Sequence, residues 1–95
     1  MVEGTNYIMN TIHEGTVVKH FKYETLSEKE KKQNKYLYRV ISTDCMHTET
    51  EEEMVVYQAM YEPYKTFVRP KDLFFSLVDK DKYPFIKQQY KFEKI

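Results

Sequence analysis

Residues 54–75 constrain the fold most, because they combine the densest apolar and aromatic run in the chain with a turn and an Arg-Pro pair. Residues 54–61 are rich in β-branched and aromatic side chains, which predicts a strand with most of both faces covered. Successive side chains point to opposite faces, so Tyr57 and Tyr61 share one face of this strand.

The residues after this strand predict a turn, a second strand and a helical turn. Residues 62–65 contain Pro63, which presets the backbone angle of a turn and cannot donate to a strand ladder. Residues 66–69 are long enough for a short strand, and Pro70 suits the first turn of a helix over residues 71–78. We expect Leu73, Phe74 and Leu77 to point inward from that helix.

Three further segments have strand patterns, namely residues 15–22, 36–43 and 90–93. Residues 44–53 are polar and end in three glutamates, so they predict the exposed turn of a hairpin with residues 54–61. Residues 23–35 have no sustained apolar stripe and predict a solvated loop; the alternative is a short helix capped by Thr25 or Ser27. Residues 5–13 fit either a short helix ended by Gly15 or a frayed tail.

Five short strands in 95 residues predict one mainly β domain. A small closed barrel hides the edges of such a sheet. The order of four strands, a helical turn and a last strand is that of an SH3-like barrel. We therefore expect a single domain over residues 1–95, with residues 1–14 as an N-terminal extension and residues 15–95 as the barrel.

Charge and cysteine content exclude several classes of protein. Lys plus Arg and Asp plus Glu are both 15, and the pI is about 6.8, which argues against a strongly basic nucleic-acid binder. The single cysteine allows no internal disulfide and favours a reducing cytoplasm. There is neither a membrane-spanning apolar run nor a signal-peptide pattern, so we expect a cytoplasmic protein with no membrane partner.

Several short motifs follow one another in a characteristic order. They are Lys19-His20-Phe21-Lys22, Tyr38-Arg39-Val40, His47-Thr48-Glu49-Thr50, Val55-Val56-Tyr57-Gln58-Ala59-Met60-Tyr61 and Phe67-Val68-Arg69-Pro70. Together they resemble the small bacterial family known as domain of unknown function 1653, over roughly residues 15–78. The resemblance implies a small SH3-type barrel and brings no known activity, cofactor or catalytic residue. The sequence departs from the family pattern in an insertion over residues 25–35, in Glu62-Pro63 at a turn, and in Phe67 where tryptophan is common.

Arginine is rare here, since Arg39 and Arg69 stand against thirteen lysines. A planar guanidinium grips carboxylates and phosphates with two hydrogen bonds, whereas an ammonium acts as a point charge. Arg69 and Phe67 share a face of their strand, and Tyr57 or Tyr61 on the neighbouring strand completes an Arg-aromatic surface. The alternative is that Arg69 forms a structural ion pair and the tyrosines belong to the core.

His20, His47 and Glu49 are the second candidate group, because two imidazoles and a carboxylate form a facial metal set. Their spacing in the sequence does not bring His20 near the other two, and no HExxH or CxxC pattern is present. The alternative is that His47 forms hydrogen bonds within its own turn. No catalytic residue, metal site or cofactor is assigned from the sequence.

The sequence does not assign a biochemical function, but it favours a non-enzymatic interaction module. This module binds a protein segment or a small anionic ligand on the surface formed by Tyr57, Tyr61, Phe67 and Arg69. The alternative is a small metal-dependent or acid/base enzyme that uses His20, His47 and Glu49. A further alternative is RNA or single-stranded DNA binding, which the neutral net charge disfavours, and homodimerisation through an uncovered strand edge is a separate hypothesis.

Overall fold

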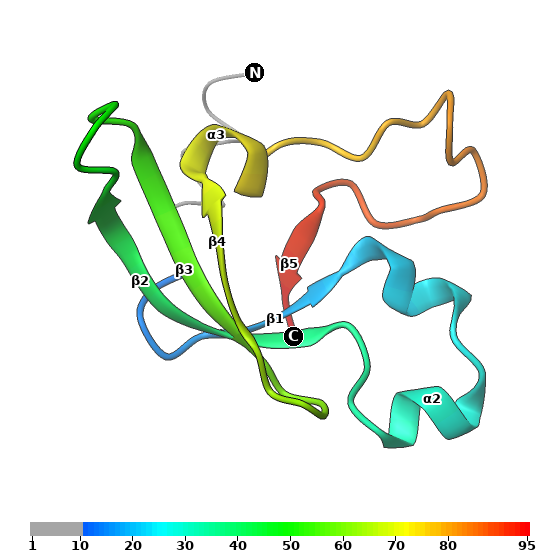
Figure 1. The fold of residues 1–95 in the computed structure, drawn as a ribbon. Helices are drawn as coiled ribbons and strands as arrows, with labels where there is room; N and C mark the ends of the chain where they lie inside the picture. Colours follow the sequence, from blue (N-terminus) through cyan, green and yellow to red (C-terminus); the bar gives the residue numbers. More distant parts are fainter. Residues whose placement is uncertain (1–10) are drawn as a thin grey trace.

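The computed structural model describes residues 11–95 and arranges them as one antiparallel sheet with short helices (Figure 1). The elements, in chain order, are β1 (Val17–His20), the 3₁₀ helix η1 (Phe21–Thr25), α2 (Glu28–Lys32), β2 (Leu37–Met46), β3 (Glu53–Ala59), β4 (Thr66–Pro70), α3 (Lys71–Phe74) and β5 (Phe92–Lys94).

The five strands lie in the order β4-β3-β2-β1-β5, and every neighbouring pair is antiparallel. The prediction of a mainly β protein with five short strands is confirmed. The closed SH3-like barrel is not confirmed, because in the described part of the chain β4 and β5 are the two edges of an open sheet. The three residues of β5 all pair with β1, whereas closure requires a pairing between β5 and β4.

The long strand β2 connects the two halves of the sheet. Its first residues pair with β1, and its pairing with β3 is irregular between Val40 and Ser42 and between Ser42 and Cys45. Such irregularities bend a strand and increase its twist. Figure 1 shows β2 curving from β1 toward its hairpin with β3. The predicted hairpin is present, but β2 continues to Met46, past the predicted end at Thr43.

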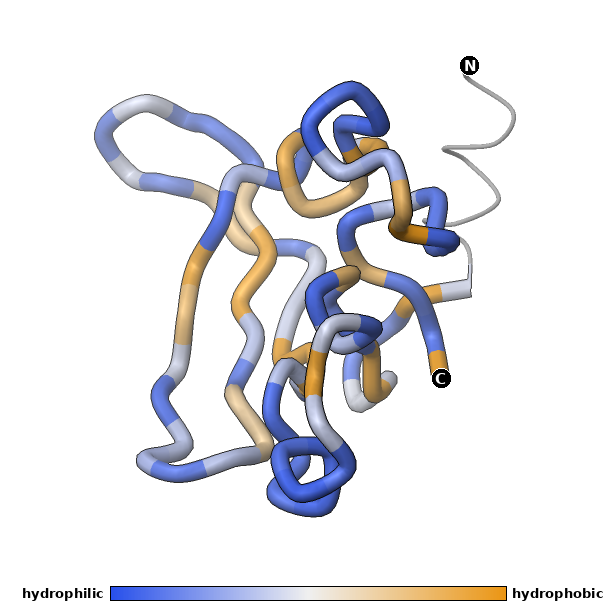
Figure 2. The backbone as a smooth tube through the Cα atoms, turned by 90° about the vertical axis from the view of Figure 1, so that its right-hand side faces the viewer, coloured by the Kyte–Doolittle hydropathy of each residue, from blue (hydrophilic) through white to orange (hydrophobic). Residues whose placement is uncertain are grey.

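The main core lies between the sheet and α3. Val55, Tyr57 and Ala59 of β3 are buried, so the odd-numbered face of this strand is the inner one. Phe74 of α3 stacks on Phe92 of β5 with ring centroids 4.3 Å apart, and both side chains are almost completely buried. Figure 2 shows hydrophobic residues (orange) along the strands, whereas the hairpin loops are mainly hydrophilic (blue).

The helical turn after β4 is shorter than predicted. Helix α3 ends at Phe74, and the next residue, Phe75, is buried with it. Phe74 points inward as expected. Leu73 and Leu77 are 49% and 57% exposed, so their predicted inward orientation is wrong. With only four residues the helix presents a single narrow face to the core, and Phe74 occupies it.

Residues 23–35 are more ordered than the predicted solvated loop. They include the end of η1 and all of α2, which begins with a capping box between Ser27 and Glu30. The Ser27 hydroxyl accepts a hydrogen bond from the Glu30 amide (3.2 Å), and the Glu30 carboxylate accepts one from the Ser27 amide (3.1 Å). These bonds satisfy amide donors that the first helical turn leaves without partners. The alternative of a helix capped by Ser27 is therefore the one that the structure adopts.

The N-terminal prediction falls mostly on residues outside the described part of the chain. Of the proposed helix over residues 5–13, the described Ile12 is buried in the main core. Gly15 has a φ of 89°, a left-handed conformation that favours glycine, and it follows the segment as the expected break. Among residues 11–95, no helix has the length and apolar character that a membrane crossing requires.

Candidate functional site

The pairing of β3 with β4 places Arg69 beside two aromatic rings. Tyr57 pairs with Phe67, so Arg69, two residues further along β4, projects from the same face. The Arg69 Nε donates a hydrogen bond to the Tyr57 hydroxyl (3.3 Å), and the Tyr57 and Phe67 rings are stacked at 5.7 Å. The guanidinium carbon lies 5.4 Å from the centroid of the Phe92 ring, which fits a cation–π contact. The predicted grouping of Arg69, Phe67 and Tyr57 is present.

Arg69 has no carboxylate partner among the described residues. The three ion pairs found there are Lys31–Glu28, Lys35–Glu30 and Lys71–Glu53. The structural ion pair considered for Arg69 is thus not formed within residues 11–95. The same alternative placed the tyrosines in the core. This holds for Tyr57, whose ring is buried in the core while its hydroxyl contacts the Arg69 guanidinium.

His20 lies next to Arg69 at the end of β1. Its ring centroid is 5.1 Å from that of Phe92 and 5.5 Å from that of Tyr36. Its Nδ1 accepts a hydrogen bond from the Lys22 amide (3.1 Å), so in the neutral ring the proton is on Nε2. Burial, together with the positive charges of Arg69, Lys22 and Lys91, lowers the pKa of His20 to about 4. At neutral pH, His20 is therefore an uncharged hydrogen-bond donor among cations.

Two pockets adjoin at this point and share His20, Lys22 and Arg69. We call them together the Arg69 groove. The first, of about 230 Å³, is otherwise lined by Tyr36, Tyr38, Tyr57, Phe67 and Phe92. The second, of about 290 Å³, is otherwise lined by Phe21, Asp79, Lys82, Tyr83 and Lys91. The groove thus has an aromatic half and a basic half.

The basic half contains four cations and one carboxylate. The cations are Lys22, Arg69, Lys82 and Lys91. None of them forms an ion pair with a described acidic residue. Asp79 uses its Oδ1 to accept hydrogen bonds from the amides of Asp81 (3.0 Å) and Lys82 (3.3 Å), which hold its own turn. The electrostatic balance of the groove is therefore positive, although the chain has no net charge.

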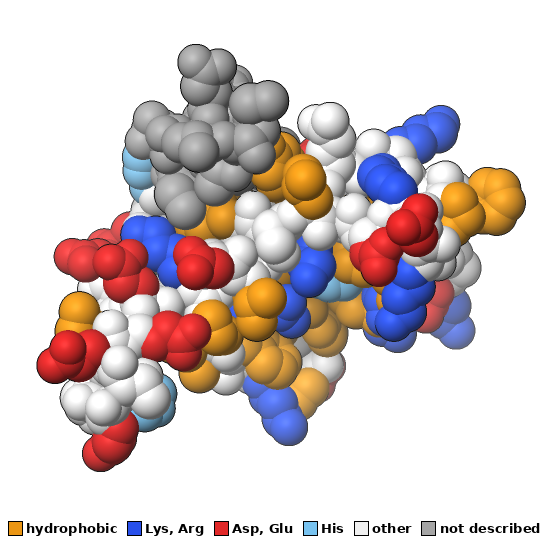
Figure 3. Space-filling model, turned by 90° about the horizontal axis from the view of Figure 1, so that it is seen from above, with side chains coloured by type: hydrophobic (Ala, Val, Ile, Leu, Met, Phe, Trp, Pro, Cys, Tyr) orange, Lys and Arg blue, Asp and Glu red, His pale blue; other side chains and the backbone are white. Residues whose placement is uncertain are grey.

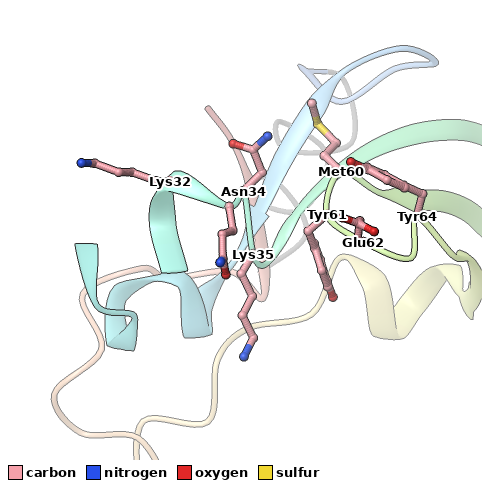
Figure 4. Close-up of a pocket in the computed structure, with 8 residues that line it drawn as sticks. Lys32, Asn34, Lys35, Met60, Tyr61, Glu62 and Tyr64 are labelled. Atoms are coloured by element: carbon pink, nitrogen blue, oxygen red, sulfur yellow. The ribbon is translucent and has the colours of Figure 1, made fainter. Parts of the chain in front are cut away.

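Tyr61, the fourth member of the predicted surface, lies beside the groove rather than in it. Its hydroxyl is 2.9 Å from that of Tyr38, which lines the aromatic half. Tyr61 itself lines a third pocket of about 570 Å³, shown in Figure 4. The pocket's other lining residues are Lys32, Gln33, Asn34, Lys35, Met60, Glu62 and Tyr64. Its walls are the end of α2 with the residues that follow it, and the turn between β3 and β4.

His47 and Glu49 lie elsewhere, in the hairpin turn between β2 and β3. The His47 Nδ1 accepts hydrogen bonds from the amides of Glu49 (3.1 Å) and Thr50 (3.3 Å), the alternative role considered for this histidine. Within residues 11–95, no three His, Cys, Asp or Glu side chains are grouped so that they could hold a metal ion. The structure therefore does not assemble the set of His20, His47 and Glu49.

Sequence reasoning missed several residues of the groove. Lys22, Tyr36, Lys82, Lys91 and Phe92 were not proposed as site residues. They come from separate parts of the chain. Tyr36 meets the end of β1 through a hydrogen bond from the His20 amide to its carbonyl, and the others meet because β5 pairs with β1 and residue 91 binds the start of η1. The one local signal was His20-Phe21-Lys22, in which a basic residue follows the histidine at the end of a strand.

The fold and the groove define a small antiparallel-sheet domain with a basic, aromatic hollow beside its β1–β5 and β3–β4 pairs. The chain belongs to the family described as Protein of unknown function (DUF1653), whose model matches residues 16–94. This match confirms the resemblance, and it extends beyond residue 78 to include β5. No curated protein and no solved structure matches the chain significantly.

Proposed function

We propose that this protein is a small binding module that takes an anionic group in the Arg69 groove. The group belongs to a small ligand or to a segment of another protein. The observation that supports this most is the set of four groove cations without an acidic partner among the described residues. Like charges repel one another at this range, and a bound anion relieves that repulsion.

The position of Arg69 suits this role. Tyr57 accepts a hydrogen bond from Nε, which fixes the orientation of the guanidinium plane and leaves the terminal nitrogens free of that bond. Those nitrogens form a fork that matches the two oxygens of a carboxylate or phosphate. The uncharged His20 supplies a further donor through Nε2 without adding to the repulsion. The aromatic half of the groove then offers rings to the rest of the ligand.

The test uses the two arginines of the chain as a matched pair. Arg69→Gln removes the groove guanidinium, whereas Arg39→Gln removes an exposed one that donates to the Gly15 carbonyl (3.0 Å) and lines none of the pockets described above. Inorganic phosphate is titrated into each variant at low ionic strength, and binding is followed by calorimetry.

We expect Arg69→Gln to weaken phosphate binding by about 10- to 100-fold, the loss typical of a charge-assisted hydrogen bond. Arg39→Gln should leave binding unchanged. Circular dichroism spectra identical to that of the wild type show that both variants are folded. Equal effects of the two substitutions, or no phosphate binding by the wild type, would contradict the proposed function.

A further inference from the structure

The third pocket lies next to the Arg69 groove, although the two share no lining residue. Lys35 and Tyr61 line the third pocket, and their neighbours Tyr36 and Tyr38 line the aromatic half of the groove. Tyr61 spans the boundary, because its hydroxyl reaches that of Tyr38. Figure 4 shows the side chains of Lys35 and Tyr61 extending in the same direction from the two walls of the pocket. We call the resulting line of three pockets the track.

Each pocket of the track offers a cation and an aromatic ring. The third pocket offers Lys35, whose ammonium also contacts the Glu30 carboxylate (3.4 Å), and Tyr64, which is 54% exposed. The aromatic half of the groove offers Arg69 with Phe67, which is 37% exposed. The basic half offers Lys82 and Lys91 with the half-buried Tyr83. The track thus repeats one combination of groups three times.

A ligand that fits such a repeat alternates anionic groups with flat rings. In single-stranded nucleic acid every phosphate is followed by a base, and proteins that bind it without sequence preference combine a positive groove with rings on which bases stack. A small anion fills only one of the three pockets. An acidic peptide supplies the charge but not a ring at every step. The repeated pairing of cation and ring therefore favours a nucleic-acid strand.

The neutral net charge does not oppose this ligand, because lysine and arginine outnumber acidic residues in the lining of the track. Acidic residues concentrate on the β2–β3 hairpin, at Asp44, Glu49, Glu51, Glu52 and Glu53. Figure 3 shows many acidic side chains (red) at this end of the molecule, and lysine and arginine (blue) in the middle and at the opposite end, where further acidic side chains also lie. The track itself holds two carboxylates, Glu62 and Asp79, and the latter is engaged by turn amides. A strand in the track therefore meets mostly positive charge.

We propose that the track binds single-stranded nucleic acid, with phosphates beside Lys35, Arg69 and Lys82 and bases on the accessible rings. This proposal rests on the anion binding of the proposed function, and it assigns the anion to a nucleotide chain in place of a small ligand or a protein segment.

The test measures fluorescence anisotropy of a labelled ten-nucleotide oligo-U, with oligo-dT for comparison. Oligo-U should bind more tightly than uridine monophosphate, because the oligomer reaches all three pockets. Binding should weaken as salt increases, with a logarithmic slope of about −2 for three phosphate contacts. Phe67→Leu and Tyr64→Leu should each weaken oligo-U binding by about tenfold or more through lost stacking. Phe85→Leu is the matched control, since Phe85 is 93% exposed and lines none of the three pockets.

The outcomes separate this proposal from the one it rests on. If phosphate binds through Arg69 but oligo-U binds no more tightly than uridine monophosphate, the track proposal is overturned and the proposed function stands. If neither phosphate nor oligo-U binds, both fail. Equal effects of Phe67→Leu and Phe85→Leu overturn the track, as does an acidic peptide that competes as well as oligo-dT. Both track variants place leucine at exposed positions, and a thermal melt verifies that each is folded.

Discussion

The acid sensitivity of the fold should depend on His20. In the unfolded chain its pKa is close to 6.5, whereas in the folded protein burial and the neighbouring cations lower the pKa to about 4. The folded state therefore binds fewer protons than the unfolded state between these values. His20 costs no stability above pH 6.5, and its destabilising effect grows as the pH falls toward 4.

The size of this effect follows from the two pKa values. Each tenfold difference in proton affinity corresponds to about 1.4 kcal/mol, which gives about 2 kcal/mol lost at pH 5 relative to pH 7. Because His20 is only half-buried, solvent screening reduces this figure, and we expect a loss of about 1 kcal/mol.

The assay is urea denaturation at pH 7, 6 and 5, at constant ionic strength. Between pH 7 and pH 5, the free energy of unfolding should fall by about 1 kcal/mol less in His20→Gln than in the wild type. This difference does not depend on how stable the variant is at pH 7. His47→Gln is the control, because His47 is exposed in the hairpin turn, and it should follow the wild type. Parallel pH profiles for all three proteins, or an NMR titration of His20 centred near 6.5, would refute the reasoning.

Two further predictions concern the buried ring of Phe74 and the hydrogen bonds that Glu24 accepts. Phe74→Ala should lower the free energy of unfolding by about 3–5 kcal/mol in urea denaturation, because this ring is fully buried and stacks on Phe92. The control Phe85→Ala, at a position 93% exposed, should change the free energy of unfolding by less than about 0.5 kcal/mol. The Glu24 carboxylate accepts hydrogen bonds from the amides of Lys87 (2.9 Å) and Gln88 (2.7 Å), which lower its pKa although burial opposes them. Glu24→Gln should therefore cost about 1 kcal/mol at pH 7, and the difference from the wild type should shrink as the pH falls below 4.5 through the folded pKa. A Glu24→Gln protein whose deficit in unfolding free energy stays constant from pH 7 to pH 3 would contradict this account.

Local patterns were sufficient to predict the strands. β-branched and aromatic runs located all five, because half-buried strands select these residues wherever the rest of the chain lies. Alternation also placed Arg69 with Phe67, since a strand's periodicity depends on its backbone alone. The strand register, which local patterns left open between Tyr57 and Tyr61, places Tyr57 opposite Phe67.

Features that depend on distant segments were predicted less well. Whether the sheet closes depends on what β5 pairs with, and its three residues carry no signal for β1 over β4. The orientation of Leu73 and Leu77 depends on where α3 ends, and it ends at Phe74, with the buried Phe75 as its C-cap. The groove cations Lys82 and Lys91 join Arg69 only through the return of residues 79–91 to the β1 side.

Anion binding in the Arg69 groove is tested most directly by NMR of the arginine side chains. The chain contains two arginines, so a ¹H–¹⁵N spectrum has two Nε–H signals, and Arg39→Gln assigns them. We predict that inorganic phosphate shifts the Arg69 signal in a saturable manner and leaves the Arg39 signal in place. Equal shifts of both signals, or no shift of either, would contradict the assignment of the Arg69 groove as an anion-binding site.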